Sequence, residues 1–181
     1  MRKLVVYTLL SVDGVAESPD RYVLDFDEAM YANLRQVIEA QDAVLLGRRT
    51  YDDWAGYWPT ADDQPFADFI NGVAKYVATS TPPSTSWAST TVVDGSVPDF
   101  VRDLKEQPGG DIGVHGSIEL ARSLFAAGLV DELRLVIAPA VAGAGRRLFE
   151  GEGELQELEL VRSAGTPSGA VLVDYRVRRH D

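Results

Sequence analysis

The sequence predicts an α/β fold in which a mostly parallel central sheet carries helices on both faces and ends in an antiparallel hairpin. Short, continuously apolar runs such as LVVYTLL (residues 4–10) and AVLLG (residues 43–47) are typical of strands covered on both faces. Amphipathic segments alternate with these runs, as they do in βαβ units. Near the C-terminus two strand-like runs are separated only by RSAGTPSG, a linker typical of a hairpin.

The first half of the chain contains strands and helices in alternation. Residues 26–41 place their large apolar side chains on one stripe of a helix, and Asp27 is the expected N-cap. Residues 49–59 form a helix that Pro59 ends, and residues 65–72 form one with proline in its first turn. The expected elements are strands at residues 4–10, 43–47, 75–80 and 90–95, and helices at residues 26–41, 49–59 and 65–72.

The second half continues this alternation and then changes. The helix at residues 98–110 ends in Pro-Gly-Gly, and a Gly-Ser corner begins the next helix. From residue 170 onward apolar and polar side chains alternate with a period of two, as in a half-buried strand. The expected elements are helices at residues 98–110 and 117–127, and strands at residues 111–115, 132–139, 154–161 and 170–179.

Composition excludes several classes of protein. The formal net charge of −11 leads us to expect no nucleic acid and no membrane as a partner. The chain has no cysteine and two histidines, His115 and His180, so we expect no metal site. No apolar stretch approaches the roughly 20 residues of a membrane span, and the N-terminal run reaches Asp13 without a signal-peptide cleavage site. We therefore expect one cytoplasmic domain spanning residues 1–181.

The corner GVHGSIEL has two interpretations. Ligands of parallel sheets bind beyond the carboxyl ends of the strands, where Gly116 lets the chain turn tightly and the first N–H groups of the next helix favour a phosphate. In the structural interpretation Ser117 caps the helix and Gly128 ends it. This segment alone leaves both open.

Two adjacent arginines, Arg48 and Arg49, directly follow the second predicted strand. An arginine fork suits phosphate, whereas two cations at a helix N-terminus oppose the helix dipole. A solvated helix end is the alternative, but an anionic ligand is favoured in so acidic a chain. The hydroxyl side chains after the third strand form a second candidate wall of that site; they are Thr79, Ser80 and Thr81.

Three further features are less specific. The segment PAVAGAGRRLF lacks the third glycine and the following helix of a dinucleotide fingerprint, so we interpret it as a loop beside a pocket. Asp13 is the acid of the first loop most suited to be a general acid or stabilising carboxylate, whereas capping and surface charge explain the others. The cluster Trp54, Tyr57 and Trp58 is interpreted as core or subunit interface in preference to a ligand platform.

Five segments in this order resemble the dihydrofolate reductase superfamily: SVDG, LLGRRTYDDW, KYVATST, GVHGSIELARSLFAAGLVDEL and PAVAGAGRRLF. The chain is most similar to the branch that contains the reductase domain of bacterial riboflavin biosynthesis. The resemblance covers nearly the whole chain and implies the dihydrofolate reductase-like three-layer fold. It also implies NADPH as cofactor at the carboxyl edge of the sheet, and a homodimer.

Motif matching implies a place for each part of the cofactor. The GRRT segment would hold the adenosine 2′-phosphate and adjacent phosphates, with the Thr-Ser-Thr segment on the other side. The HGSI segment would lie at the diphosphate, and the loop after Asp13 near the nicotinamide. The implied cofactor-binding residues are Gly14, Val15, Ala16, Gly47, Arg48, Arg49, Thr50, Thr79, Ser80, Thr81, His115, Gly116, Ser117 and Ile118.

The chain departs from true dihydrofolate reductases where a helix carboxylate holds the pterin. Counting back from Gly47, the ungapped match is Tyr31, with Asp27 and Glu28 one turn earlier, so folate is not the expected substrate. The Asp-Gly of SVDG matches the riboflavin-type branch, although the residues identify no ribityl-phosphate site. Asp13 and Tyr31 are the expected catalytic residues that assist protonation, with a bound water as the alternative.

The expected function is NADPH-dependent hydride transfer to a small heterocycle that resembles a pterin, a pyrimidine or a riboflavin precursor. Such a reaction requires alignment of the two reactants, exclusion of water and a proton source. The alternative is a non-catalytic dimer that binds a nucleotide or other ligand without turnover. A flavin-binding reductase is a third hypothesis, for which no segment marks a site.

Overall fold

The structure is a computed structural model that describes residues 1–151 and 153–178. Its strands are β1 (Leu4–Leu10), β2 (Gln41–Gly47), β3 (Ala74–Ala78), β4 (Thr90–Val92), β5 (Asp111–His115), β6 (Glu132–Ile137), β7 (Leu158–Gly165) and β8 (Val171–Val177). Within the described residues they form one sheet in the order β4-β3-β2-β5-β1-β6-β8-β7. Neighbours from β4 to β6 pair in parallel, and β8 pairs antiparallel with both β6 and β7. The predicted α/β class, with its parallel sheet and terminal hairpin, is confirmed.

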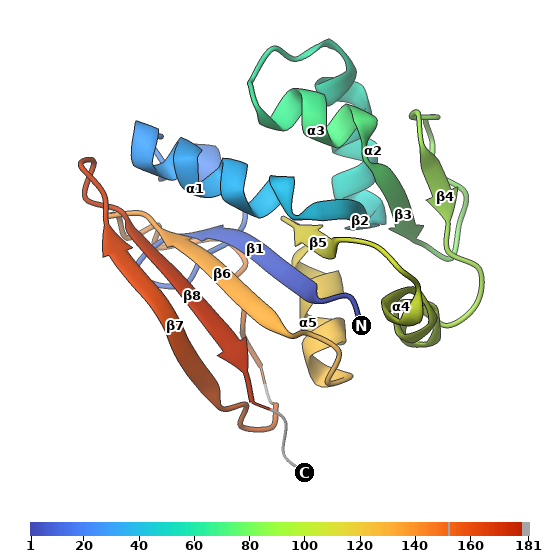
Figure 1. The fold of residues 1–181 in the computed structure, drawn as a ribbon. Helices are drawn as coiled ribbons and strands as arrows, with labels where there is room; N and C mark the ends of the chain where they lie inside the picture. Colours follow the sequence, from blue (N-terminus) through green and yellow to red (C-terminus); the bar gives the residue numbers. More distant parts are fainter. Residues whose placement is uncertain (152, 179–181) are drawn as a thin grey trace.

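Helices cover both faces of the sheet (Figure 1). They are α1 (Glu28–Glu39), α2 (Arg48–Tyr57) and α3 (Phe66–Gly72) on one face, and α4 (Val97–Glu106) and α5 (Ile118–Ala126) on the other. A separate apolar core fills each interface between sheet and helices. Side chains of β1 enter both cores, Leu4 and Val6 on the α5 face and Tyr7 on the α1 face, because successive strand residues point to opposite sides. This double burial explains the continuous apolar run of that segment.

Local signals place the helix ends. Asp27 is the N-cap of α1 as predicted, since its carboxylate accepts a hydrogen bond from the backbone N–H of Met30. At the end of α5, Gly128 has a φ of +65° and the N–H of Leu129 donates to the carbonyl of Leu124, which is a Schellman motif. The glycine predicted to end this helix therefore does so.

The C-terminal hairpin differs from the prediction. The strand expected at residues 154–161 is β7, at Leu158–Gly165, and the turn comprises only residues 166–170. The residues from Arg162 to Gly165, which composition assigned to the linker, extend the strand by pairing with β8, and Arg162 forms an ion pair with Asp174 across that pair. Turn residues are thus confined to the end of the Gly/Pro/Ser segment. Position 179, at the end of the expected last strand, lies outside the described residues.

A buried lysine anchors the C-terminal end of helix α3. Lys75 is fully buried, and its Nζ donates to the carbonyl of Ile70 (2.8 Å) and to that of Val73 (2.9 Å). These carbonyls belong to the C-terminal end of α3, which lacks intrahelical partners for them. Nζ also lies 4.6 Å from the centre of the Trp87 ring. Lys75 therefore fixes the position of α3, whose first residue lines the cavity described next.

Candidate functional site

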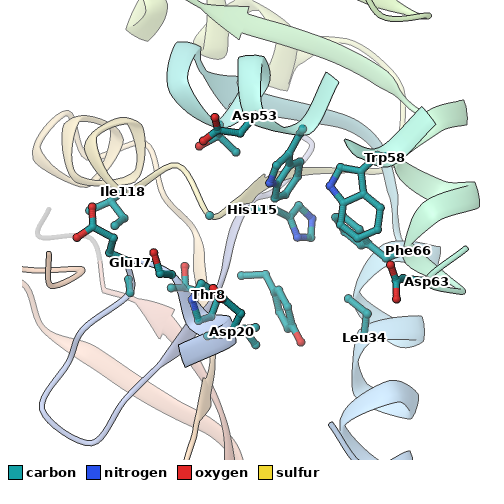
Figure 2. A pocket seen from close by; sticks show the side chains of 18 of the residues that line it. Thr8, Glu17, Asp20, Leu34, Asp53, Trp58, Asp63, Phe66, His115 and Ile118 are labelled. Carbon is teal, nitrogen blue, oxygen red and sulfur yellow. The ribbon is translucent and has the colours of Figure 1, made fainter. Parts of the chain in front are cut away.

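A cavity of about 740 Å³ lies at the carboxyl ends of β1 and β5, where the topology places ligand sites of parallel sheets. Its floor comes from these strands, and its walls from α1, α2, the start of α3, the start of α5 and the loop after β1. Figure 2 shows Glu17 and Ile118 on one side of this cavity and Trp58, Phe66 and Asp63 on the other, with His115 between them.

The N-terminal ends of α2 and α5 meet beside this cavity. The backbone N–H of Gly47, which precedes α2, donates to Oγ of Ser117, which precedes α5, over 2.9 Å. Ser117 is the N-cap residue of α5 as predicted, but its hydroxyl makes this long-range bond and no side-chain capping bond. The two helix ends, each with unpaired N–H groups and a partial positive charge, lie side by side.

The two arginines of GRRT have different surroundings. Arg48 is held by Asp52 (Nε to Oδ2, 3.1 Å) and also donates to Oγ1 of Thr81, so the structure brings the predicted segments GRRT and Thr-Ser-Thr together. Arg48 does not line the cavity. Arg49 lines the cavity and is exposed, and none of the described residues forms an ion pair or hydrogen bond with its guanidinium. Arg49 is thus the arginine that is available to an anion.

His115 lies on the cavity floor as a neutral ring. It is 3% exposed, packs against the rings of Tyr7, Phe66 and Phe69, and has its Nε2 2.7 Å from Oε1 of Gln41. Burial lowers the pKa of His115 to about 4, so the ring carries no charge at neutral pH. His180 lies outside the described residues.

Sequence reasoning missed Gln41, which lies at the start of β2 and is 8% exposed. One signal was present in the sequence. Gly113 lies in the interior of β5, and a Cβ there would come within 2.2 Å of Oε1 of Gln41. A glycine inside a buried strand often marks such a close approach.

Asp13 does not line the cavity, and its carboxylate is committed to the chain itself. Its oxygens accept hydrogen bonds from Oγ of Ser11 (2.6 Å) and from the N–H groups of Ala142 (2.9 Å) and Gly143 (3.0 Å). These bonds, led by that from Ser11, lower the pKa of Asp13 to about 2. The position and charge of Asp13 therefore do not support its expected role as a proton donor; it joins the loop after β1 to the loop after β6.

Glu17 strengthens the same junction. Its carboxylate binds Arg146 through the backbone N–H (3.1 Å) and through Nε (2.8 Å). Both of these residues line the cavity, as does neighbouring Ala16, whose backbone N–H donates to the carbonyl of Arg146. The glycine-rich loop thus borders the pocket, as its sequence indicated.

One side of the cavity is aromatic. Tyr31 lines it, in edge-to-face contact with Phe26 at 4.7 Å between ring centres. Trp54 and Trp58 line it as well and pack on Phe66, which closes the wall. Both tryptophans also pack against the apolar core of this face, in agreement with their interpretation as core residues. Tyr57 does not line the cavity, and its hydroxyl donates to Asp63 over 2.5 Å.

The structure thus divides the predicted site residues into two groups. Those that line the cavity are Ala16, Tyr31, Arg49, Thr50, His115, Gly116 and Ile118. Those that lie outside its lining are Asp13, Gly14, Val15, Gly47, Arg48, Thr79, Ser80, Thr81 and Ser117. Sequence reasoning missed the cavity carboxylates Asp20, Asp53 and Asp63. Asp53 was detectable as a residue one helical turn after Arg49.

Comparison with known proteins agrees with this architecture. Residues 2–172 match the RibD C-terminal domain family. The chain belongs to that family. Its relatives include the Bacillus subtilis proteins YyaP, 29% identical over 96% of this chain and 94% of that protein, and YwjB, 29% identical over 91% of each chain; both are described as uncharacterised.

Two solved structures share the fold of this RibD C-terminal domain. A candidate riboflavin biosynthesis protein of Shewanella sp. PV-4 has a TM-score of 0.76 at 17% identity and covers 98% of this chain and 99% of its own. A pyrimidine reductase-like protein of Corynebacterium diphtheriae has a TM-score of 0.66 at 15% identity, covering 99% of this chain and 93% of its own. The predicted dihydrofolate reductase-like fold is thereby confirmed. No helix in the described ranges is long and apolar enough to cross a membrane, and the same ranges contain no group of three histidines and acids placed to hold a metal.

Proposed function

We propose that this protein is an NADPH-dependent reductase that transfers a hydride to a small planar heterocycle. The observation that carries the proposal is the junction of α2 and α5 at Gly47 and Ser117, which aims two positive helix ends at one edge of the cavity. Arg49 adds a guanidinium at the same edge that has no ion-pair or hydrogen-bond partner among the described residues. Membership of the RibD C-terminal domain family supports this choice of reaction.

The residues present fit a dinucleotide. Gly116 has a φ of +69°, so the chain turns into α5 where its first N–H groups can receive a diphosphate. Arg49 and Thr50 would hold phosphate oxygens, while Ala16 and Ile118 would bound the dinucleotide on the loop side of the cavity. When bound, NADPH supplies the hydride, and the chain supplies position and shielding from water.

The aromatic side of the cavity would hold the acceptor ring. Tyr31, Trp54, Trp58 and Phe66 offer flat apolar surfaces that stack on a planar ring and exclude water from it. Tyr31 is the proton donor that we propose, since its side chain lines the cavity and no described residue hydrogen-bonds to its hydroxyl.

The test is cofactor binding followed by turnover. Thermal-shift measurements with NADPH, NADH and FMN should show the largest rise in Tm with NADPH. Oxidation of NADPH, followed by its absorbance, should then occur with at least one member of a panel of pterins, pyrimidinediones and ribityl-substituted pyrimidines. Absence of a shift with every nucleotide would overturn the proposal.

One observation favours a second candidate, a non-catalytic nucleotide- or ligand-binding protein. Asp13, the acid that the sequence offers as a proton donor, is ionised at neutral pH and directed at backbone N–H groups. This candidate predicts tight binding of NADPH with no oxidation over the whole panel. Oxidation that persists in Asp13→Asn but falls in Tyr31→Phe would exclude it.

We also propose that two copies pair through β7, the edge strand of the sheet. Leu160 and Val161 are each more than half exposed on this strand, and Leu158 is also exposed. An apolar edge strand favours pairing with a second copy. Light scattering after size exclusion should give twice the chain mass for the wild type and the single chain mass for Leu160→Lys. A monomeric wild type would contradict the pairing.

A further inference from the structure

Gln41 holds the imidazole of His115 in one tautomer. Oε1 of Gln41 lies 2.7 Å from Nε2 of His115, and both side chains are more than nine-tenths buried. In this orientation of the Gln41 amide the carbonyl oxygen accepts, so Nε2 of His115 carries the ring proton and Nδ1 has a free lone pair. The amide nitrogen of Gln41 is buried and has no hydrogen-bond partner among the described residues. The ring is therefore a hydrogen-bond acceptor at Nδ1.

The strand sequence makes room for this contact. A Cβ at Gly113 would lie 2.2 Å from Oε1 and 2.6 Å from Cδ of Gln41, so no other residue fits at position 113 while Gln41 keeps its place. Glycine inside a strand costs stability, about 0.5–1 kcal/mol relative to alanine. Gly113 therefore weakens strand β5 slightly and leaves the space in which Gln41 contacts His115.

The surroundings keep His115 uncharged. The side chains packed against it are Tyr7 from β1, Phe66 and Phe69 from α3 and Gln41 from β2, none of which is charged at neutral pH. Burial also opposes protonation of the ring. A neutral imidazole with its proton held at Nε2 persists over the whole physiological pH range.

The cavity wall carries a complementary donor. Nε1 of Trp58 is buried and has no hydrogen-bond partner among the described residues, and Nδ1 of His115 has none there either. Both side chains line the cavity, and in Figure 2 the indole nitrogen is on the side of Trp58 that faces His115. A free acceptor and a free donor thus belong to one wall of the cavity.

We propose that His115 and Trp58 bind the amide-like edge of a planar ring: Nδ1 of His115 accepts from a ring N–H, and Nε1 of Trp58 donates to a carbonyl oxygen. Gln41 is then a positioning residue that acts through His115. The proposal rests on the proposed function for the location of the ring, but it requires no turnover.

The first experiment reads the tautomer directly. The chain has only two histidines, so long-range ¹⁵N–¹H correlation spectra contain two imidazoles, and His180→Gln assigns them. We expect His115 to show a protonated Nε2 and a bare Nδ1, unchanged between about pH 5.5 and 7. A proton on Nδ1, or titration of His115 in that range, would overturn the proposal.

The second experiment measures binding of two probes by fluorescence: pteridine-2,4-dione and its 1,3-dimethyl derivative, which lacks both ring N–H groups. The wild type should bind the first probe about tenfold more tightly than the second, which is the effect of one buried hydrogen bond.

Two variants test the roles of the individual side chains. In Gln41→Glu the carboxylate raises the pKa of His115, so the preference for the first probe over its dimethyl derivative should shrink as the pH falls from about 7 to 5.5. Trp58→Phe keeps an aromatic ring but removes the indole N–H. It should weaken the binding of both probes by the same factor, since both probes retain their carbonyl oxygens. Equal binding of the two probes by the wild type would overturn the proposal. Neither experiment measures NADPH oxidation, so a failure of the reductase proposal is recognised separately.

Discussion

The backbone N–H of Gly47 and Oγ of Ser117 are 2.9 Å apart, which joins the start of α2 to the start of α5. Ser117 is 5% exposed, so Ser117→Ala removes a buried hydroxyl and leaves the half-buried N–H of Gly47 without this partner. We expect the free energy of unfolding to fall by about 1–2 kcal/mol, measured by urea denaturation, and NADPH binding to weaken. The control is Ser123→Ala on the exposed surface of α5, which should change stability by less than about 0.5 kcal/mol. Equal losses in the two variants would contradict this role of Ser117.

Arg49→Ala should weaken NADPH binding by roughly tenfold or more, because a charge-assisted hydrogen bond to phosphate is lost. Titration calorimetry gives the dissociation constant. The matched control is Arg102→Ala on α4, an exposed arginine whose partner is Asp99, which should bind NADPH like the wild type. If Arg102→Ala weakened binding as much as Arg49→Ala, the effect would be one of net charge and not of the site.

Two buried tyrosines should respond oppositely to loss of their hydroxyl groups. Tyr7 has Asn33 as a polar neighbour, yet its hydroxyl forms no hydrogen bond of normal geometry with any described residue, and burial raises its pKa. Tyr51, equally buried, donates to the carbonyl of Thr85 over 3.0 Å. Tyr7→Phe should leave the free energy of unfolding unchanged or raise it, whereas Tyr51→Phe should lower it by about 1 kcal/mol. Urea denaturation measures both, and a loss in Tyr7→Phe would reveal a partner for its hydroxyl.

Asp27 should make the free energy of unfolding depend on pH in the acidic range. Burial opposes its ionisation, but the N–H groups of Ser168 and Met30 outweigh it and hold the pKa of Asp27 well below its usual range. A carboxyl whose pKa is lower in the folded state stabilises the protein above its unfolded pKa of about 4, and this stability is lost as the pH falls further. The urea midpoint of Asp27→Asn should thus be below that of the wild type at neutral pH, and the gap should narrow below about pH 4. Asp25→Asn, at an exposed position, is the control and should show no gap at either pH.

The sequence was sufficient to predict those parts of the structure in which one physical effect dominates. The apolar runs of β1 and β2 are continuous because both of their faces are buried, and parallel pairing then brings their following loops to one edge. The meeting of the GRRT, Thr-Ser-Thr and HGSI segments follows from this topology. Local capping by Asp27 and Gly128 was predictable for the same reason, since each signal lies within a few residues of its effect.

Partners that are distant along the chain were not predictable. The hydroxyl of Ser117 bonds to Gly47 and not to its own helix, and the carboxylate of Asp13 bonds to the N–H groups of residues 142 and 143. Both are short polar side chains of types that are also common as helix caps or, for aspartate, as catalytic acids. The residue type alone therefore does not indicate the distant partner. Strand β7 has an irregularity between Leu160 and Arg162 and an ion pair of Arg162 with Asp174, neither of which has a sequence pattern.

The junction of the two loops beside the cavity restricts how this site can change. Asp13 and Glu17 bind residues 142–146, so the loop after β1 and the loop after β6 are joined at several points. These bonds require that the lengths of the two loops match. An insertion in either loop would separate a carboxylate from its N–H partners unless the other loop lengthened with it. Related proteins with a larger acceptor pocket should therefore show paired insertions in these two loops, and grafting one loop without the other should fail.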